Sequence, residues 1–323
     1  MRPPGRRRLL RTSYTADSHS RMPLARSVLV TSPLQLSVVV ACRRPGPALA
    51  EVLGALRTAC GGISAEILLA CAGRPPAPDL LAAAPEARAI SGPANALVPD
   101  LWGLGLREAR GGVTAFTTAE FVVSRTWARA LLDSLGSGAT GAGGAIALGE
   151  PASVVDRAVY FLRYSAFQPP LDDGPVGEIP GDNAAYRSDA LRRHSGSMAG
   201  GFWEVDFHRR IRREGGTLRI ARDATATFRS GGTLPERLRE RFRHGRHSGA
   251  YRAGPLGHPW WRGVLAAPLV PALLAARVLR RAARAGRLGP ALGGLPALLP
   301  LAGAWALGEA VGALGARTGR AAE

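Results

Sequence analysis

Apolar, strand-like runs that alternate with helical segments constrain the fold of this chain more than any other feature. The first run, Leu36–Cys42, is apolar at nearly every position, which is typical of a parallel strand buried on both faces. A helical segment follows at Ala48–Ala59, and two glycines end it. Further strands are predicted at 66–71, 87–90 and 113–117, and further helices at 101–110 and 125–135. This alternation predicts an α/β fold with a doubly wound, mostly parallel sheet that has helices on both faces.

Glycine dominates residues 136–144, and this stretch carries little else that would anchor it in a core. We interpret it as a flexible loop. After it, strands are predicted at 145–149, 217–221 and 224–228, and helices at 154–167 and 234–252. Residues 1–33 are basic and polar, and their one apolar run is too short for the core of a signal peptide, so they predict a disordered arm.

The chain contains no lysine, so all its Lys/Arg-type cations are arginines, and the formal net charge is +18. Such a charge suits nucleic acid or an anionic membrane surface. No nucleic-acid motif accompanies it, and the few aromatic residues are not interleaved with the basic clusters as stacking platforms require. We therefore expect a membrane surface, and no nucleic acid, among the partners.

A turn rich in Pro, Gly, Asp and Asn stands ahead of the most informative predicted helix. The turn contains Asp182 and Asn183, and the helix carries Glu204 and Asp206 near its start. Acids in a first helical turn are stabilised by the macrodipole. An acid at this place, beside a Gly-rich turn, is well sited to face a cleft and accept a proton. Because the two acids are two positions apart, a helix would point them to different sides.

These pieces resemble the acceptor half of family 2 glycosyltransferases. There, an Asn-containing loop is followed by an acidic pair on a helix that continues to Arg-Leu/Ile and a Gly, here Arg210-Ile211 and Gly215. The segment 98–111 resembles the family's helix before its metal-site strand, and Trp127 stands where a Trp often follows that strand. The resemblance covers roughly residues 36–252. It implies a GT-A-like sheet and the transfer of a sugar, with inversion, from a nucleotide-diphosphate sugar.

The family's Asp-x-Asp motif corresponds to residues 116–120, where the sequence departs from the pattern. In the family, two acids hold a divalent cation, Mg²⁺ or Mn²⁺, against the diphosphate. Here Thr118 replaces the first acid and Glu120 remains as the one candidate metal ligand. The acid that often follows the second strand is replaced by 71–73. The resemblance thus implies donor binding at Thr118 and Glu120 and leaves the use of a divalent cation open.

On the acceptor side, Glu204 corresponds to the family's catalytic Asp by register against Arg210 and Gly215, and Asp206 is the second candidate for the base. Both acids could instead serve only to start the helix. Asp182 and Asn183 either position the acceptor or the donor diphosphate, or they only form a turn. These alternatives stay open at the level of sequence.

The basic run at 241–252 stands where processive members of the family carry Gln-x-x-Arg-Trp. That motif is absent, which favours transfer of a single sugar over polymer synthesis. His244 and Arg246 are candidates to bind diphosphate oxygens, since arginine offers a bidentate fork. The other arginines of the run are expected to lie solvated against anionic lipid.

The C-terminal region is apolar and interrupted by arginines. Trp260 and Trp261 predict an interfacial anchor. Residues 264–276 are too few to span a bilayer, which takes about 20 residues, and we expect them to lie in the interface. Residues 288–307 lack charge and could span, or could pack on the protein's own domain. The arginines of 277–287 should remain on the cytoplasmic side.

We therefore expect three regions: the arm at 1–33, a GT-A-like domain at 34–255 and membrane-associated helices at 256–323. The expected function is transfer of one sugar to a hydroxyl of a lipid-linked or cell-envelope glycan, at the cell membrane, with the catalytic domain in the cytoplasm. The alternative is a non-catalytic membrane scaffold or glycan-binding protein of the same fold, because two donor-side acids are missing.

Overall fold

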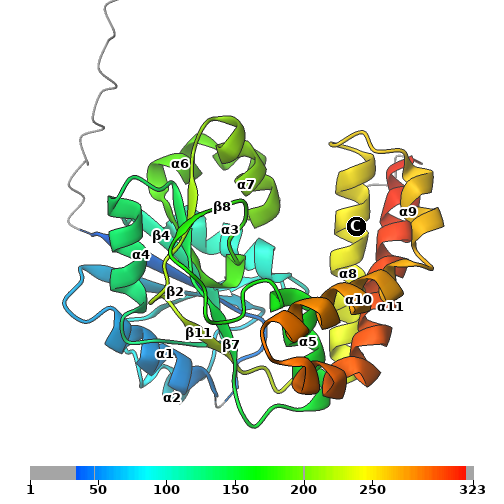
Figure 1. Ribbon diagram of the computed structural model, residues 1–323. Helices are drawn as coiled ribbons and strands as arrows, with labels where there is room; N and C mark the ends of the chain where they lie inside the picture. The colour runs from blue at the N-terminus through cyan, green and yellow to red at the C-terminus, as the bar shows by residue number, and fades with distance from the viewer. Residues whose placement is uncertain (1–33, 47, 199–200, 318–323) are drawn as a thin grey trace, which may run out of the picture. The chain divides into compact units, whose positions relative to one another are not determined.

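The structure is a computed structural model that describes residues 34–46, 48–198 and 201–317. The disordered arm predicted at 1–33 lies outside the described residues. Within them the chain is α/β, as the alternation of strand and helix signals predicts (Figure 1).

A mixed sheet of eight strands forms the centre of the described part, in the order β3-β2-β1-β4-β9-β6-β10-β8. The first four of these run parallel, as predicted. Strand β9 was not predicted, and it lies antiparallel between β4 and β6. The strands span Leu36–Cys42 (β1), Ala65–Ala72 (β2), Arg88–Gly92 (β3), Val113–Thr118 (β4), Gly141–Gly143 (β6), Gly174–Val176 (β8), Ala184–Arg187 (β9) and Leu218–Ile220 (β10).

The Gly-rich stretch at 136–144 is not a flexible loop, contrary to the prediction. Gly141–Gly143 forms β6, whose residues are all buried. A Cβ on Gly141 would lie 2.7 Å from the ring of Tyr186, and one on Gly144 would lie 1.8 Å from the carbonyl oxygen of Ala224. Neighbouring elements approach the backbone so closely that only glycine fits, which is one of the established uses of glycine inside a sheet.

A second, smaller sheet has the order β5-β11-β7. Two of its strands, β7 (Ile146–Leu148) and β11 (Ala226–Phe228), fall within predicted strands and pair in parallel. The third, β5 (Phe121–Val123), directly follows β4 and pairs antiparallel with β11. This sheet brings the segment after β11 next to the end of β4.

Helices cover both faces of the main sheet. Along β1, Val38 and Val40 pack into a core shared with α1 (Ala48–Ala59), α4 (Trp127–Gly136) and α5 (Val154–Tyr164). The alternate residues, Val39 and Ala41, pack with α3 (Val98–Glu108), α6 (Ser188–Arg193) and α7 (Glu204–Arg213). A short helix, α2 (Pro78–Leu81), follows β2. Because successive side chains of a strand point to opposite faces, an all-apolar strand requires two such layers.

Two long helices, α8 (Leu234–Ala253) and α11 (Leu288–Arg317), pack side by side (Figure 1), and their backbones approach closely at glycines. A Cβ on Gly308 would lie 2.1 Å from the carbonyl oxygen of Phe242, and one on Gly312 would lie 1.9 Å from that of Arg246. From Gly308 to Gly312 on α11, the contacted carbonyl on α8 moves from Phe242 to Arg246, in the same chain direction, so the two helices run parallel. Such contacts between backbones require small residues at the crossing.

The first half of α11 packs against α5, where a Cβ on Gly294 would lie 3.0 Å from the backbone nitrogen of Ala158. Helix α11 is long and apolar enough to cross a membrane, although more than half of its apolar window is buried inside the protein, and it continues through Pro296 and Pro300. Ahead of it, α9 (Trp260–Ala266) and α10 (Val270–Arg284) are bent by 71°.

Candidate active site

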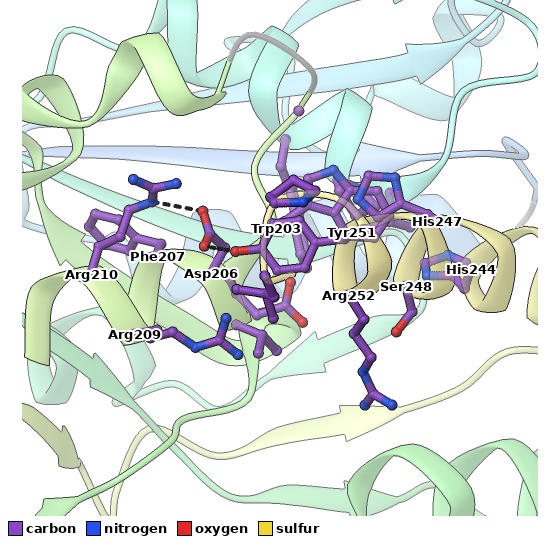
Figure 2. Close-up of a pocket in the computed structure, with 18 of the residues that line it drawn as sticks. Trp203, Asp206, Phe207, Arg209, Arg210, His244, His247, Ser248, Tyr251 and Arg252 are labelled. Carbon is purple, nitrogen blue, oxygen red and sulfur yellow. Dashed lines mark hydrogen bonds and ion pairs between the residues drawn. The ribbon is translucent and has the colours of Figure 1, made fainter. Parts of the chain in front are cut away.

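A cavity of about 660 Å³ lies between the N-terminal end of α7 and the middle of α8. The start of α3 forms one wall, and Figure 2 shows the side chains of α7 and α8 that face each other across it. Apolar side chains, arginines and histidines share its lining. They include Val98, Trp102, Trp203, Val205, Leu256 and Trp305, together with Arg163, Arg209, Arg210, Arg241, Arg252, His244 and His247.

Glu204, the predicted base, lines this cavity at the first position of α7. Its carboxylate takes part in no ion pair among the described residues. Burial raises the pKa of Glu204 above its ordinary value, and the nearby Asp182 carboxylate adds to this rise. Its side chain lies against Gly181, where a Cβ would be 2.8 Å from Cγ and 2.9 Å from Cδ of Glu204. A carboxylate with a raised pKa that opens onto a cavity is suited to accept a proton.

Asp182 is buried, with 3% of its surface exposed, and lies close to Glu204. Its Oδ2 accepts hydrogen bonds from Arg163 Nη2 at 2.8 Å and from the Tyr164 hydroxyl at 3.0 Å. Its Oδ1 is buried without a hydrogen-bond partner. A buried charge of this kind needs compensation, and Arg163, which also lines the cavity, supplies it. Asp182 therefore orients Arg163 and influences Glu204 electrostatically.

Asp206 also lines the cavity, which corrects the expectation that it would face a different side from Glu204. Its carboxylate is engaged on both oxygens (Figure 2). Arg210 Nε donates to Oδ2 at 2.8 Å, and the Tyr251 hydroxyl donates to Oδ1. The second contact ties α7 to α8. Asp206 thus holds the two sides of the cavity together, while Glu204 is the carboxylate left unpaired.

Aromatic packing fixes the backbone from which Glu204 projects. The ring of Phe202 stacks on Phe116 of β4 at a centroid distance of 4.4 Å, and the Phe202 N–H donates to the Pro99 carbonyl at 2.8 Å. The next residue, Trp203, stacks on His247 of α8 at 3.5 Å with an interplanar angle of 5°. Phe202 is completely buried, so the start of α7 is anchored to the sheet on one side and to α8 on the other.

Of the two residues predicted to bind diphosphate, His244 lines the cavity and Arg246 does not. The backbone of Arg246 instead meets Gly308 and Gly312 in the crossing of α8 and α11. One turn earlier, Arg241 lines the cavity with a buried Nε that has no hydrogen-bond partner. Burial lowers the pKa of Arg241 to about 10, and Arg163 adds to this effect. Burial likewise lowers the pKa of His244 to about 3.

A second cavity, of about 300 Å³, lies where β1 and β4 end. The crevice beyond the carboxyl ends of parallel strands is the usual ligand site of an open α/β sheet. Thr118 and Glu120 line it, as do Arg43 and Arg44 after β1. The segment after β11 and the first turns of α8 complete the wall, with Arg229, Ser230, Gly231, Gly232, Arg237 and Glu240. Val98 lines both cavities.

Glu120, the candidate metal ligand, is held by an arginine. Arg237 Nη2 donates to Glu120 Oε1, and Nη1 of the same guanidinium donates to Glu240 Oε2 at 2.8 Å. The hydroxyl of Thr118 accepts from the Glu120 N–H at 3.2 Å. Burial raises the pKa of Glu120, against the opposing effect of Arg237. These residues do not fit a divalent cation, since its carboxylate ligand is already engaged. Across the described ranges, no group of three or more His, Cys, Asp or Glu is arranged to hold a metal ion.

Asn183, predicted to contact a substrate, is fully buried and joins the two sheets. Its Oδ1 accepts from Trp127 Nε1 at 2.6 Å, and its Nδ2 donates to the carbonyls of Ala145 and Ala224 at 2.9 and 2.8 Å. It lines neither cavity. The geometry of this amide is that of a structural residue.

The sequence did not single out Arg163, Arg237 or Trp203, although all three line the cavities. Arg241 was expected to lie solvated against lipid, and this was wrong, because it lines the larger cavity. Arg163 and Trp203 carry no spacing signal, and the arginines of 237–246 look alike in sequence. Position on the helix decides which of them turn inward. Neither the models of known protein families nor the sequences of curated proteins match this chain.

Proposed function

We propose that this protein is a GT-A-like, inverting glycosyltransferase, which moves one sugar from a nucleotide-diphosphate sugar to an acceptor hydroxyl. The observation that carries the proposal is the Glu204 carboxylate. It is unpaired within the described part of the chain, its pKa is raised, and it opens onto a cavity beside the ends of parallel strands. Leaving a partly buried carboxylate unpaired costs stability, so its presence there favours a chemical role.

The two cavities divide the substrates between them. The nucleotide diphosphate binds in the cavity at the strand ends, where arginines surround Thr118 and Glu120. The acceptor enters the cavity between α7 and α8, and the transferred sugar lies where the cavities meet, near Val98. Glu204 then accepts the proton of the acceptor hydroxyl. The hydroxyl oxygen forms a bond to C1 of the sugar as the bond from C1 to the diphosphate breaks, and the diphosphate leaves with the electron pair.

The acceptor is a lipid-linked or cell-envelope glycan, because the C-terminal helices suit a membrane surface. Leu265, Leu269 and Leu273 of the α9–α10 segment are 68%, 64% and 64% exposed. Arginines follow them on α10, and an apolar face beside basic residues is typical of helices that lie in a membrane interface. Helix α11 stays on this surface rather than crossing, since it packs along α8, whose arginines would be costly in hydrocarbon. The catalytic domain is cytoplasmic, where nucleotide sugars are available.

A donor screen with Glu204→Gln as the matched variant tests the proposal. The full chain in anionic vesicles is incubated with a panel of nucleotide sugars and a membrane lipid extract, and the released nucleoside diphosphate is measured. We expect turnover with one donor and a loss of at least about 100-fold in Glu204→Gln. Full activity of this variant would refute the assignment of the base.

The pairing of Asp206 and of Glu120 favours a second candidate, a non-catalytic scaffold of the same fold that binds a glycan or nucleotide. Both carboxylates are engaged by arginines, and two donor-side acids of the family 2 pattern are replaced in this chain. No turnover with any donor, together with measurable glycan binding, would select the scaffold over the enzyme.

A further inference from the structure

The ion pair between Arg237 and Glu120 conflicts with a divalent-cation site at the end of β4. A cation needs free carboxylate oxygens at this place. Glu120 is occupied by Arg237, and Thr118 offers only a hydroxyl that already accepts the Glu120 N–H. The nearest further carboxylate on α8, Glu240, is bound by Arg237 at 2.8 Å and by Arg43 at 2.9 Å. Every carboxylate that could hold a metal here is bound to a guanidinium.

Arg237 is built into this position. Only 8% of its surface is exposed, and Glu120, Glu240 and Ser230 surround its guanidinium. Room for the guanidinium depends on Gly232, because a Cβ there would lie 2.6 Å from Arg237 Nε. That Nε is buried without a hydrogen-bond partner. A buried arginine held between two carboxylates, with its space provided by a glycine, is fixed in place, and Arg43 shares the charge of Glu240 with it.

We propose that the Arg237 guanidinium takes the place of a divalent cation, and that Arg237 and Arg43 bind the diphosphate of the nucleotide sugar without metal. This inference rests on the proposed function. Both arginines line the cavity at the strand ends. Arginine remains protonated at every physiological pH. Arg43 has further N–H donors beside the contact of its Nη1 with Glu240, and Arg237 has one further N–H on Nη1 beside its contacts with Glu240, Glu120 and Ser230.

The same pair stabilises the leaving group. When the bond between sugar C1 and the diphosphate oxygen breaks, the electron pair and the negative charge stay on the diphosphate. Fixed guanidinium groups meet that charge without reorganising, because Glu120 and Glu240 already hold Arg237 in place. The proton of the acceptor leaves on Glu204, so the step balances with no metal and no further reactant.

Calorimetry on the full-length wild-type protein tests this directly. Nucleoside diphosphates carrying each common base are titrated in a buffer with EDTA and again in a buffer with Mn²⁺. We expect the Kd of the preferred nucleotide to agree within about twofold between the two buffers. A gain of tenfold or more with Mn²⁺ would overturn the inference while leaving the proposed function intact. No binding of any nucleotide in either buffer would overturn both.

Three variants sharpen the test. Arg237→Gln should weaken nucleotide binding at least tenfold, the scale on which one charge-assisted contact acts. Arg239→Gln, an exposed neighbour on the same helix, should leave binding unchanged. Thr118→Asp combined with Arg237→Ala supplies two carboxylates and frees Glu120, and this variant should bind Mn²⁺ by electron paramagnetic resonance. If Arg237→Gln keeps full affinity, the arginine is not the diphosphate-binding cation.

Discussion

Gly181 offers a way to displace the Glu204 carboxylate without removing it. In Gly181→Ala the new Cβ would lie 2.8 Å from Cγ and 2.9 Å from Cδ of Glu204. Carbon atoms in contact are about 3.5 Å apart, so the Glu204 side chain must retreat by roughly 0.6 Å. The backbone can stay in place because the crowded atoms belong to a flexible side chain. Gly181 lines neither cavity, which leaves the substrate-binding residues unaltered.

The displacement acts on the reaction step. A misplacement of about 1 Å in an active site can cost about 100-fold in rate, so a shift of roughly 0.6 Å should lower kcat about tenfold, or about 1.4 kcal/mol in the barrier. We expect the KM of the donor to change by less than about twofold, since donor contacts are untouched. Steady-state release of nucleoside diphosphate, measured with the donor found in the screen, gives both constants.

Gly136→Ala is the matched control. It is the same chemical change at a helix end where nothing lies within 4 Å of the new Cβ, so its kcat should equal that of the wild type. Circular dichroism confirms that both variants fold. If Gly181→Ala folds and turns over at the wild-type rate, the position of the Glu204 carboxylate does not limit the reaction, and the argument for it as the base fails.

Three further predictions follow from the same contacts. The value of kcat/KM should fall as pH drops through the raised pKa of Glu204, because this carboxylate must be deprotonated to accept a proton. Asp182→Asn removes a neighbouring negative charge, so the acidic limb of the pH profile should move to lower pH. Glu204→Gln should raise Tm by about 1–2 °C while abolishing turnover, since it relieves the cost of a buried charge; a lower Tm in differential scanning calorimetry would contradict this. Gly312→Ala should destabilise the chain by about 1–3 kcal/mol, because its Cβ would lie 1.9 Å from a carbonyl of α8; Gly303→Ala in the same helix has nothing within 4 Å and should be neutral or stabilising in chemical denaturation.

The parallel strands β1 to β4 and the helices α1 and α3 between them were predictable because local signals suffice for them. Buried parallel strands are apolar throughout, and amphipathic helices repeat their apolar positions. Strand β9 was missed since Ala184–Arg187 follows directly on the turn of Asp182 and Asn183, with no gap in the pattern. Strand β6 was missed because its glycines are required by close contacts with residues distant in sequence, such as Tyr186, and a local sequence window does not contain these residues.

The candidate site was predictable in part for a similar reason. The register against the family pattern, with Arg210 and Gly215, selected Glu204, which lies at the start of α7 and lines the cavity. It could not reveal that Asp206 binds Tyr251, which lies 45 residues later in the chain. The sequence also could not distinguish Arg241 from Arg246, because arginine recurs along this run. The crossing with α11 determines which side of α8 is inaccessible.

Charge balance explains why the unpaired carboxylate is the informative one. The chain has 42 basic residues, all arginine, against 24 acidic ones, so a carboxylate near the arginines of α7 and α8 readily finds a partner. Asp206 pairs with Arg210 and Glu120 pairs with Arg237. The hydrogen bond from Tyr251 to Asp206 ties α7 to α8, and the Arg237–Glu120 ion pair ties α8 to the end of β4. Glu204 lies among the same arginines and has no ion pair within the described part of the chain, where Arg163 is bound by Asp182. Asp182 therefore holds Arg163, and removing it should let Arg163 pair with Glu204 and lower the pKa of this carboxylate.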